Sequence, residues 1–128
     1  MSSTMAKPRP KHLNLLQIRL PVPGIVSILH RISGAILFLL LPLLLWMLQA
    51  SLQSAESFAS FQSFVAHPIA KIVVLGLFWG YAHHLLAGLR HLLLDLHVGA
   101  ELATARVSSM AVLAGGIVLT VVLGVRIW

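Results

Sequence analysis

The stretch YAHHLLAGLRHLLLD, residues 81–95, sets ionisable side chains in an apolar background. Folded as a helix, it places four residues on one face, namely His84, Gly88, His91 and Asp95. Neutral imidazole is a good axial ligand for haem iron, and a glycine one turn away leaves clearance for a flat ligand. The face therefore predicts a haem between two helices, with His84 on the iron and Gly88 beside it. A histidine that only hydrogen-bonds to a neighbouring helix, with Gly88 permitting close packing, explains the same spacing.

The other histidines of this region carry weaker signals. His83 points about 100° away from His84 around the helix, and nothing in its spacing assigns it a role. His91 and His97 lie nearer the end of the span that we expect at the cytoplasmic surface, where polar groups can reach the membrane surface. Contact with lipid headgroups or with a partner explains both as well as a cofactor does.

A second group of polar residues lies in SILHRISG, residues 27–34. In a helix, Ser27 and Arg31 share one face with Gly34, and His30 is one position off. Arg31 can pair with a haem propionate, or it can bind a quinone carbonyl together with the Ser27 hydroxyl. The alternative is structural, because serine is a common helix cap and arginine reaches from a span to lipid phosphate.

The composition identifies the solvent around these groups. Of the 128 residues, 59% are hydrophobic and 9% are charged, against about 25% charged in soluble domains. A soluble core of this size cannot hide so much apolar surface, so we expect a lipid bilayer around the chain. The chain has no cysteine, which excludes disulfides and thiolate-bound clusters. Its net charge of +6 comes from scattered basic residues, so we expect no nucleic-acid partner.

Three apolar runs predict an all-α membrane protein with three transmembrane helices. The runs without charged residues are about 36, 27 and 28 Å long as helices, close to the roughly 30 Å hydrocarbon core. We expect spans near residues 25–50, 67–96 and 106–127, within a transmembrane domain of residues 25–128 that follows a basic cytoplasmic segment, residues 1–24. The first run is longer than a signal-peptide core, so we expect it to be retained. Pro42 should kink it.

Basic residues predict the orientation, because lysine and arginine favour the cytoplasmic side. Two lie on the other side, at Lys71 and Arg126, against seven on the predicted cytoplasmic side: Lys7, Arg9, Lys11, Arg19, Arg31, Arg90 and Arg106. The N-terminus is therefore expected in the cytoplasm and the C-terminus outside. SAESFASFQSFVAHP then forms a short external loop, and LHVGAELATAR forms the internal one.

At these residues the chain resembles the large cytochrome b membrane-anchor subunit of succinate dehydrogenase. The resemblance runs through RPKHLNLLQIRLP at residues 9–21, then SILHRISG, then HLLAGLRHLLLD at residues 84–95. Three spans in the same order complete it, so it covers most of the chain. His83 departs from the pattern by directly preceding His84, so the ligand is assigned by its distance from Gly88.

The resemblance implies a membrane-bound complex of four subunits in the bacterial inner membrane, a succinate:quinone oxidoreductase. A flavoprotein subunit oxidises succinate, an iron–sulfur subunit carries the electrons, and two small anchors hold haem b and help to reduce quinone to quinol. Carried onto this chain, His84 is the axial haem ligand, and Ser27 and Arg31 line the quinone site. His30, Arg31 and His91 lie near the haem propionates. Enzyme activity then belongs to the complex rather than to this chain alone.

The partner follows from the histidine count as well. His84 supplies one axial ligand, and His30 is too close to the predicted interface to supply another at the same depth. A six-coordinate haem b would therefore take its second histidine from the other anchor, packed with this chain into one helical bundle.

Three other interpretations remain open. A structural scaffold without redox function explains the spans, and so does a small transporter. Transport is disfavoured because no carboxylate lies in mid-span: Asp95 is near a span end, and Glu56 and Glu101 are in connections. An anchor of fumarate reductase would run the same chemistry in reverse, and the sequence does not decide the direction.

Overall fold

The computed structural model describes residues 19–128, which form four α-helices and no strand. The helices are α1 (Val22–Ser51), α2 (Ala55–Ala66), α3 (Pro68–Asp95) and α4 (Leu102–Ile127). Three of them, α1, α3 and α4, are long and apolar enough to cross a membrane. The all-α class and the three candidate spans are therefore confirmed. Most of the N-terminal basic segment, residues 1–18, lies outside the described part of the chain.

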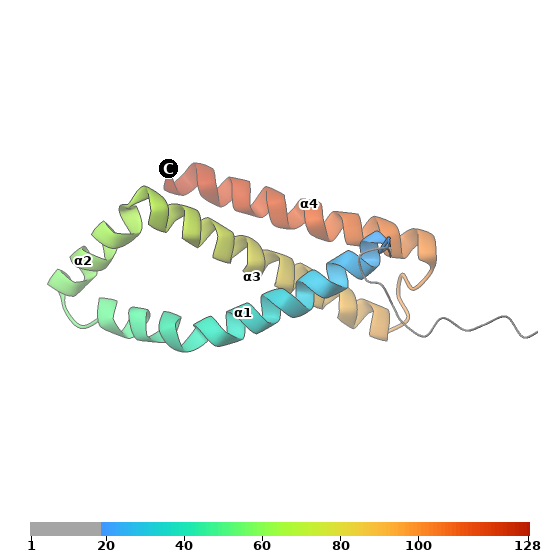
Figure 1. Cartoon of the computed structure of the whole chain (residues 1–128), viewed down its shortest axis with the longest axis horizontal. Coiled ribbons are helices and arrows are strands. Elements are labelled where there is room, and N and C mark those ends of the chain that lie inside the picture. Colours follow the sequence, from blue (N-terminus) through green and yellow to red (C-terminus); the bar gives the residue numbers. More distant parts are fainter. Residues whose placement is uncertain (1–18) are drawn as a thin grey trace, which may run out of the picture.

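The three long helices run lengthwise, and α2 bridges the end at which α1 and α3 spread apart (Figure 1). Helix α3 is central, because it packs along α4 on one side and crosses α1 on the other. Near the opposite end, close to the α3–α4 connection, all three helices meet. Val26, Ala87 and Val112, one from each long helix, form a small buried core there.

Helix α2 corrects one expectation, since residues 54–68 were expected to form a loop. Ser54 and Ser57 form a reciprocal cap: the Ser57 amide donates to the Ser54 hydroxyl oxygen (3.0 Å), and the Ser54 amide donates to that of Ser57 (2.9 Å). The cap satisfies two amides that a helix start would leave unpaired. The helix ends at Ala66, and the following Pro68 begins α3, where it needs no amide hydrogen.

Helix α1 runs without interruption from Val22 through Pro42 to Ser51. Proline removes one amide donor and crowds the preceding turn, which bends helices. The half of α1 that contains Pro42 changes direction toward α2, in line with the expected kink (Figure 1).

A buried arginine joins α3 to α4. Arg90 is 7% exposed, and its Nε donates to the Ser108 hydroxyl (2.9 Å) while its Nη2 donates to the Ala105 carbonyl (3.2 Å). Further along the same contact, Gly116 faces His83, and a Cβ on Gly116 would make an ordinary contact with the His83 backbone at 3.7 Å. The Arg90 side chain thus links the two helices through two hydrogen bonds.

His97 ends α3 in a left-handed turn. Its φ is +62°, its amide donates to Leu94, and the Val98 amide donates to Leu93. This is the Schellman arrangement, which usually takes glycine. The His97 side chain is exposed, and the structural role of the residue is to end α3.

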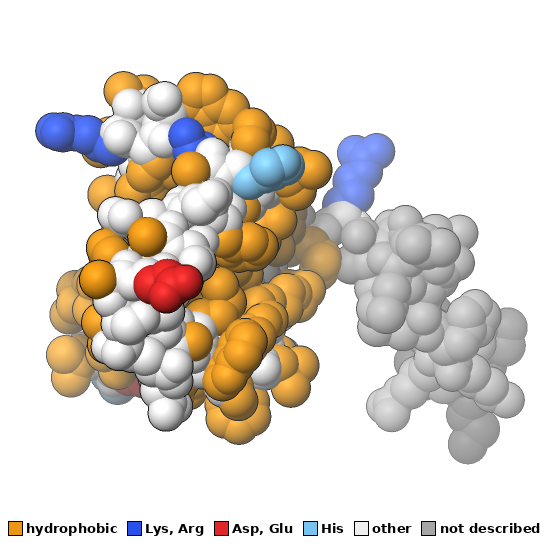
Figure 2. All heavy atoms as spheres, turned by 90° about the vertical axis from the view of Figure 1, so that its left-hand side faces the viewer, with side chains coloured by type: hydrophobic (Ala, Val, Ile, Leu, Met, Phe, Trp, Pro, Cys, Tyr) orange, Lys and Arg blue, Asp and Glu red, His pale blue; other side chains and the backbone are white. Residues whose placement is uncertain are grey.

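Most large apolar side chains point outward. Phe38 and Leu39 are 74% and 73% exposed, and similar side chains cover the outer faces of all three long helices. Seen from the α2 end, the surface is largely hydrophobic, with a few basic, histidine and acidic side chains among the apolar ones (Figure 2). Such a surface is stable against lipid or against another apolar helix, and not against water.

Candidate functional site

Three histidines gather where α1 crosses α3. His30 comes from α1, and His84 and His91 come from α3, two turns apart on one face. We call these three residues the histidine cluster. The His30 ring lies 4.2 Å from that of His84 and 4.8 Å from that of His91, nearly parallel to both. The structure therefore joins the two polar groups that the sequence placed at one depth.

The His84 ring is fixed through Nδ1. This nitrogen lies 3.1 Å from the His30 carbonyl oxygen and 3.2 Å from the Ser33 hydroxyl oxygen. A carbonyl oxygen only accepts, so Nδ1 carries the proton and donates it. The other ring nitrogen, Nε2, then carries the lone pair and has no hydrogen-bond partner among residues 19–128. That is the form of imidazole that binds a metal ion.

His91 is held in a similar way, by its own helix. Its Nδ1 lies 2.7 Å from the Ala87 carbonyl oxygen, so it too donates from Nδ1. Both α3 histidines thus keep Nε2 free at the edge of the same hollow.

Two glycines flank the cluster for different reasons. A Cβ on Gly34 would lie 2.7 Å from Cε1 of His84, which is a clash, so the His84 ring itself explains this glycine. A Cβ on Gly88 would lie 3.5 Å from Nε2 of His30, an ordinary contact. Within residues 19–128, a side chain at position 34 would therefore displace the His84 ring, whereas alanine fits at position 88.

The cluster borders a hollow of about 450 Å³ on the outer face of α3. Its lining is His30, His84, Leu85, Gly88, Leu89, His91 and Leu92. Imidazole nitrogens and a glycine meet aliphatic side chains there, a combination suited to a large, mostly apolar ligand with a few polar contacts. In the described part of the chain, no three His, Cys, Asp or Glu side chains are arranged to hold a metal ion together, and the stacked rings of the histidine cluster do not converge on one point.

The structure keeps three of the predicted residues apart from this hollow. Ser27 is half-buried and Arg31 is exposed, both one turn or less from His30 on α1. Neither lines the hollow or hydrogen-bonds to another described residue. Asp95, on the same face in the sequence, is exposed at the end of α3.

His83 points away from the cluster and into the protein. It is completely buried, its ring stacks on that of Trp79 at 5.4 Å, and Gly116 of α4 contacts its backbone. Neither of its ring nitrogens has a hydrogen bond of good geometry in the described part of the chain. His83 therefore belongs to the contact among the long helices, and His84 to the exposed face.

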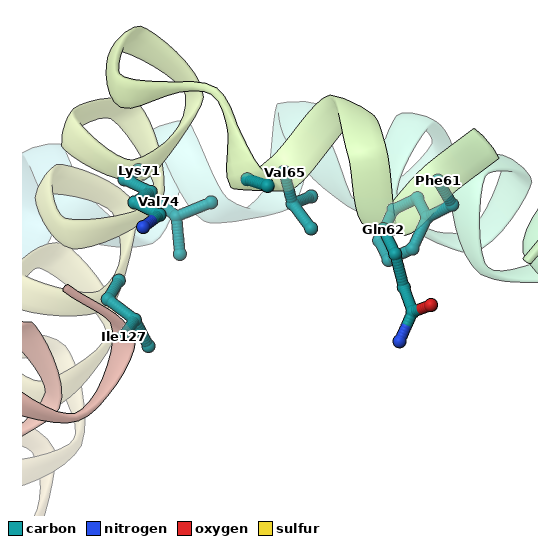
Figure 3. Close-up of a pocket in the computed structure, with 7 residues that line it drawn as sticks. Phe61, Gln62, Val65, Lys71, Val74 and Ile127 are labelled. Carbon is teal, nitrogen blue, oxygen red and sulfur yellow. The ribbon is translucent and has the colours of Figure 1, made fainter. Parts of the chain in front are cut away.

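A different hollow, of about 530 Å³, lies at the α2 end. It is lined by Phe61, Gln62, Val65, Ala66, Lys71, Val74 and Ile127, and it separates α2 from the ends of α3 and α4 (Figure 3). The Lys71 ammonium lies 5.3 Å from the centre of the Trp128 ring. This hollow is lined by one cationic side chain and no histidine, so it lacks the imidazole groups of the histidine cluster.

Sequence reasoning missed Ser33 and the steric role of Gly34. Ser33 follows His30 by three residues on α1, and its contact with His84 depends on where α1 and α3 cross. The only signal available was that a buried histidine needs a partner for its second nitrogen.

The fold and the histidine cluster define the class: an integral membrane protein of three long helices with an imidazole site facing outward from the bundle. Residues 5–123 match the family described as the succinate dehydrogenase/fumarate reductase transmembrane subunit. The chain belongs to this family. Its curated relatives are bacterial, and the chain is an integral protein of the bacterial inner membrane.

Three similar proteins are each named succinate dehydrogenase cytochrome b556 subunit. The one from Paracoccus denitrificans is 40% identical over 113 residues, covering 88% of this chain and 87% of the relative. The one from Coxiella burnetii is 36% identical over 121 residues, covering 94% and 97%. The one from Rickettsia felis is 29% identical over 119 residues, covering 93% and 91%. The match thus extends over nearly the whole length of both chains.

Proposed function

We propose that this chain is the cytochrome b subunit that anchors a succinate dehydrogenase to the membrane, with His84 as an axial ligand of haem b. The observation that carries this proposal is the state of the His84 ring. Nδ1 donates to α1, and Nε2 is free beside a hollow. The relatives named cytochrome b556 support haem b as the group that fills it.

The surroundings of His84 fit a haem. The packing of this chain leaves room for a side chain at position 88, so it does not explain the glycine there. A large planar group lying against α3 would explain it, because a side chain would then obstruct that group. His30 and His91 border the same hollow, and they are suited to hydrogen-bond propionates, with Arg31 one residue beyond His30 on α1. When bound, the haem supplies a one-electron carrier close to the quinone site.

Ser27 and Arg31 are proposed to bind quinone. They are one helical turn apart on α1, so a hydroxyl and a guanidinium can donate to the same carbonyl oxygen. Reduction of a quinone adds two electrons and two protons, and cationic or hydroxyl donors stabilise the charge that the electrons bring. Neither side chain is engaged by another described residue, which leaves both free for a ligand.

A second anchor subunit is proposed to cover the His84 face. Gly76 and Gly80 continue the line of His84 and Gly88 along α3 at intervals of four residues. A Cβ on Gly76 or Gly80 would meet nothing within 4 Å, so their smallness is not explained by the packing of this chain. Small residues four apart allow close approach of another membrane helix. That helix would bring the second haem ligand.

The remaining partners follow from the same assignment. A flavoprotein subunit and an iron–sulfur subunit would dock on the side where α1 begins and α3 ends, near the histidine cluster. The excess of basic residues makes this side cytoplasmic and sets the C-terminus outside. The family includes fumarate reductases, so the same site serves fumarate reduction if the redox potentials and the quinone favour that direction.

The test is to purify the complex through a tag on the C-terminus of this chain. We expect flavoprotein and iron–sulfur subunits to copurify, with a reduced-minus-oxidised spectrum of b-type haem and with succinate-driven quinone reduction. A tagged chain that purifies with a second membrane subunit and without haem or succinate oxidation would favour the structural scaffold. Fumarate reduction by reduced quinone, measured on the same sample, determines the preferred direction.

A further inference from the structure

Ser33 occupies a distinctive position opposite His84. It is 7% exposed, and its hydroxyl oxygen lies 3.0 Å from the His30 carbonyl oxygen and 3.2 Å from Nδ1 of His84. The same carbonyl oxygen lies 3.1 Å from that Nδ1. One nitrogen of α3 thus lies within hydrogen-bond distance of two oxygens of α1, and the Ser33 hydroxyl also hydrogen-bonds to the His30 carbonyl oxygen.

The donors can be assigned from chemistry. The carbonyl oxygen has no proton, so both of its close partners must donate to it: Nδ1–H of His84 and Oγ–H of Ser33. With its proton committed to the carbonyl, the Ser33 oxygen can only accept from Nδ1–H. The His84 proton is therefore shared between two acceptors. The opposite tautomer would lose the bond to the His30 carbonyl oxygen, and Nδ1 could then only accept from the Ser33 hydroxyl, which would give up its own bond to that carbonyl.

We propose that Ser33 is a positioning residue that sets the orientation and the basicity of His84 as a haem ligand. This inference rests on the proposed function, because it assumes that iron binds Nε2 of His84. An acceptor on Nδ1–H draws positive charge from the ring and makes Nε2 a stronger donor to the metal. A stronger donor stabilises ferric over ferrous haem and lowers the midpoint potential.

The position of the His84 ring depends on two adjacent residues of α1, Ser33 and Gly34. Gly34 lies against the ring, with a virtual Cβ 2.7 Å from its Cε1, while the hydroxyl of Ser33 holds Nδ1. Because Ser33 is buried, water has little access to replace its hydroxyl. Consecutive residues of α1 therefore fix the ring by contact and by hydrogen bonding.

A simpler role must be distinguished, since buried serines often bond to their own helix. Ser51 on α1 does so, with its hydroxyl donating to Leu48 (2.8 Å), and it is 5% exposed. Like Ser33, it lies on α1, is buried and hydrogen-bonds to the carbonyl oxygen three residues earlier, but it makes no hydrogen bond to a histidine. Ser51→Ala is therefore the matched control for Ser33→Ala.

The experiment measures the midpoint potential of haem b and the ferric electron paramagnetic resonance spectrum in the assembled complex. We expect Ser33→Ala to raise the potential and to alter the g values, and Ser51→Ala to leave both at the wild-type values. Ser33→Thr and Ser33→Val have the same shape and differ in the hydroxyl. We expect the threonine variant to stay close to wild type and the valine variant to follow Ser33→Ala. Loss of haem from an otherwise assembled complex in the alanine and valine variants, with haem retained in the threonine variant, would support the same role of the hydroxyl.

The inference is overturned if Ser33→Ala and Ser33→Val leave potential and spectrum unchanged, or if threonine and valine give the same shift. In either case the hydroxyl does not act on His84. A wild-type complex without haem b would instead contradict the proposed function, so the two failures are separable.

Discussion

Gly34→Ala should displace His84, the proposed haem ligand, because Gly34 of α1 lies against the His84 ring of α3. The new Cβ would lie 2.7 Å from Cε1 of the His84 ring, whereas ordinary contact begins at 3.4 Å. The ring must therefore retreat by about 0.7 Å. A movement of this size is enough to lengthen the 3.1 Å bond to the His30 carbonyl beyond hydrogen-bond distance.

A second glycine substitution isolates the loss of stability that the contact between the new methyl group and His84 causes. A Cβ on Gly124 would meet only Leu75, at 3.7 Å, so Gly124→Ala introduces no clash. Both changes gain about 1 kcal/mol of helix propensity, so their difference reports the contact with His84. Overpacking typically costs about 1–3 kcal/mol, and we expect Gly34→Ala to be less stable than Gly124→Ala by that amount.

The assay combines haem content per flavin with thermal unfolding of the purified complex, followed by haem absorbance. Gly34→Ala should lower both haem content and melting temperature, whereas Gly124→Ala should preserve them. If the two variants behave alike, the His84 ring is not held against α1 at Gly34, and the geometry argued for the ligand is wrong.

Other consequences can be checked in the same complex. Arg31→Ala should weaken quinone binding by about 1.5–3 kcal/mol and Ser27→Ala by about 0.5–1.5 kcal/mol. In both variants, succinate-driven quinone reduction should fall while succinate oxidation with an artificial acceptor persists. Unchanged apparent quinone affinity in both variants would mean that quinone binds elsewhere. Ser108→Ala removes the acceptor of the buried Arg90 Nε–H and should destabilise the complex by about 1–3 kcal/mol in denaturant unfolding; no loss would mean that Arg90 is satisfied by other groups. A reporter fused at Trp128 should be active on the external side, and a cytoplasmic signal would reverse the proposed orientation.

The long helices could be predicted because hydropathy alone determines them. Runs without charge that match the bilayer thickness leave few alternatives, and α1, α3 and α4 coincide with the three predicted spans to within a few residues. Helix α2 could not be predicted in the same way. Its cap uses Ser57 in place of the usual glutamate, and its twelve residues are too few to span a membrane, so the segment resembled a loop.

The histidine cluster was predictable only within α3. Helical spacing brings His84, Gly88 and His91 to one face, and the structure has all three around one hollow. The contacts with Ser33 and Gly34 depend on the crossing of α1 and α3, which is decided by packing rather than by local pattern. The burial of His83 depends likewise on its facing Gly116 of α4.

The most direct test of haem ligation compares His84→Leu with His83→Leu in the purified complex. The two residues are adjacent and the substitution is the same, but one borders the hollow and the other is buried among the long helices. The measurement is the reduced-minus-oxidised absorption spectrum, normalised to flavin. We expect His84→Leu to abolish or shift the b-type signal and His83→Leu to retain it. A normal spectrum in His84→Leu, together with loss of haem in His83→Leu, would contradict His84 as the ligand.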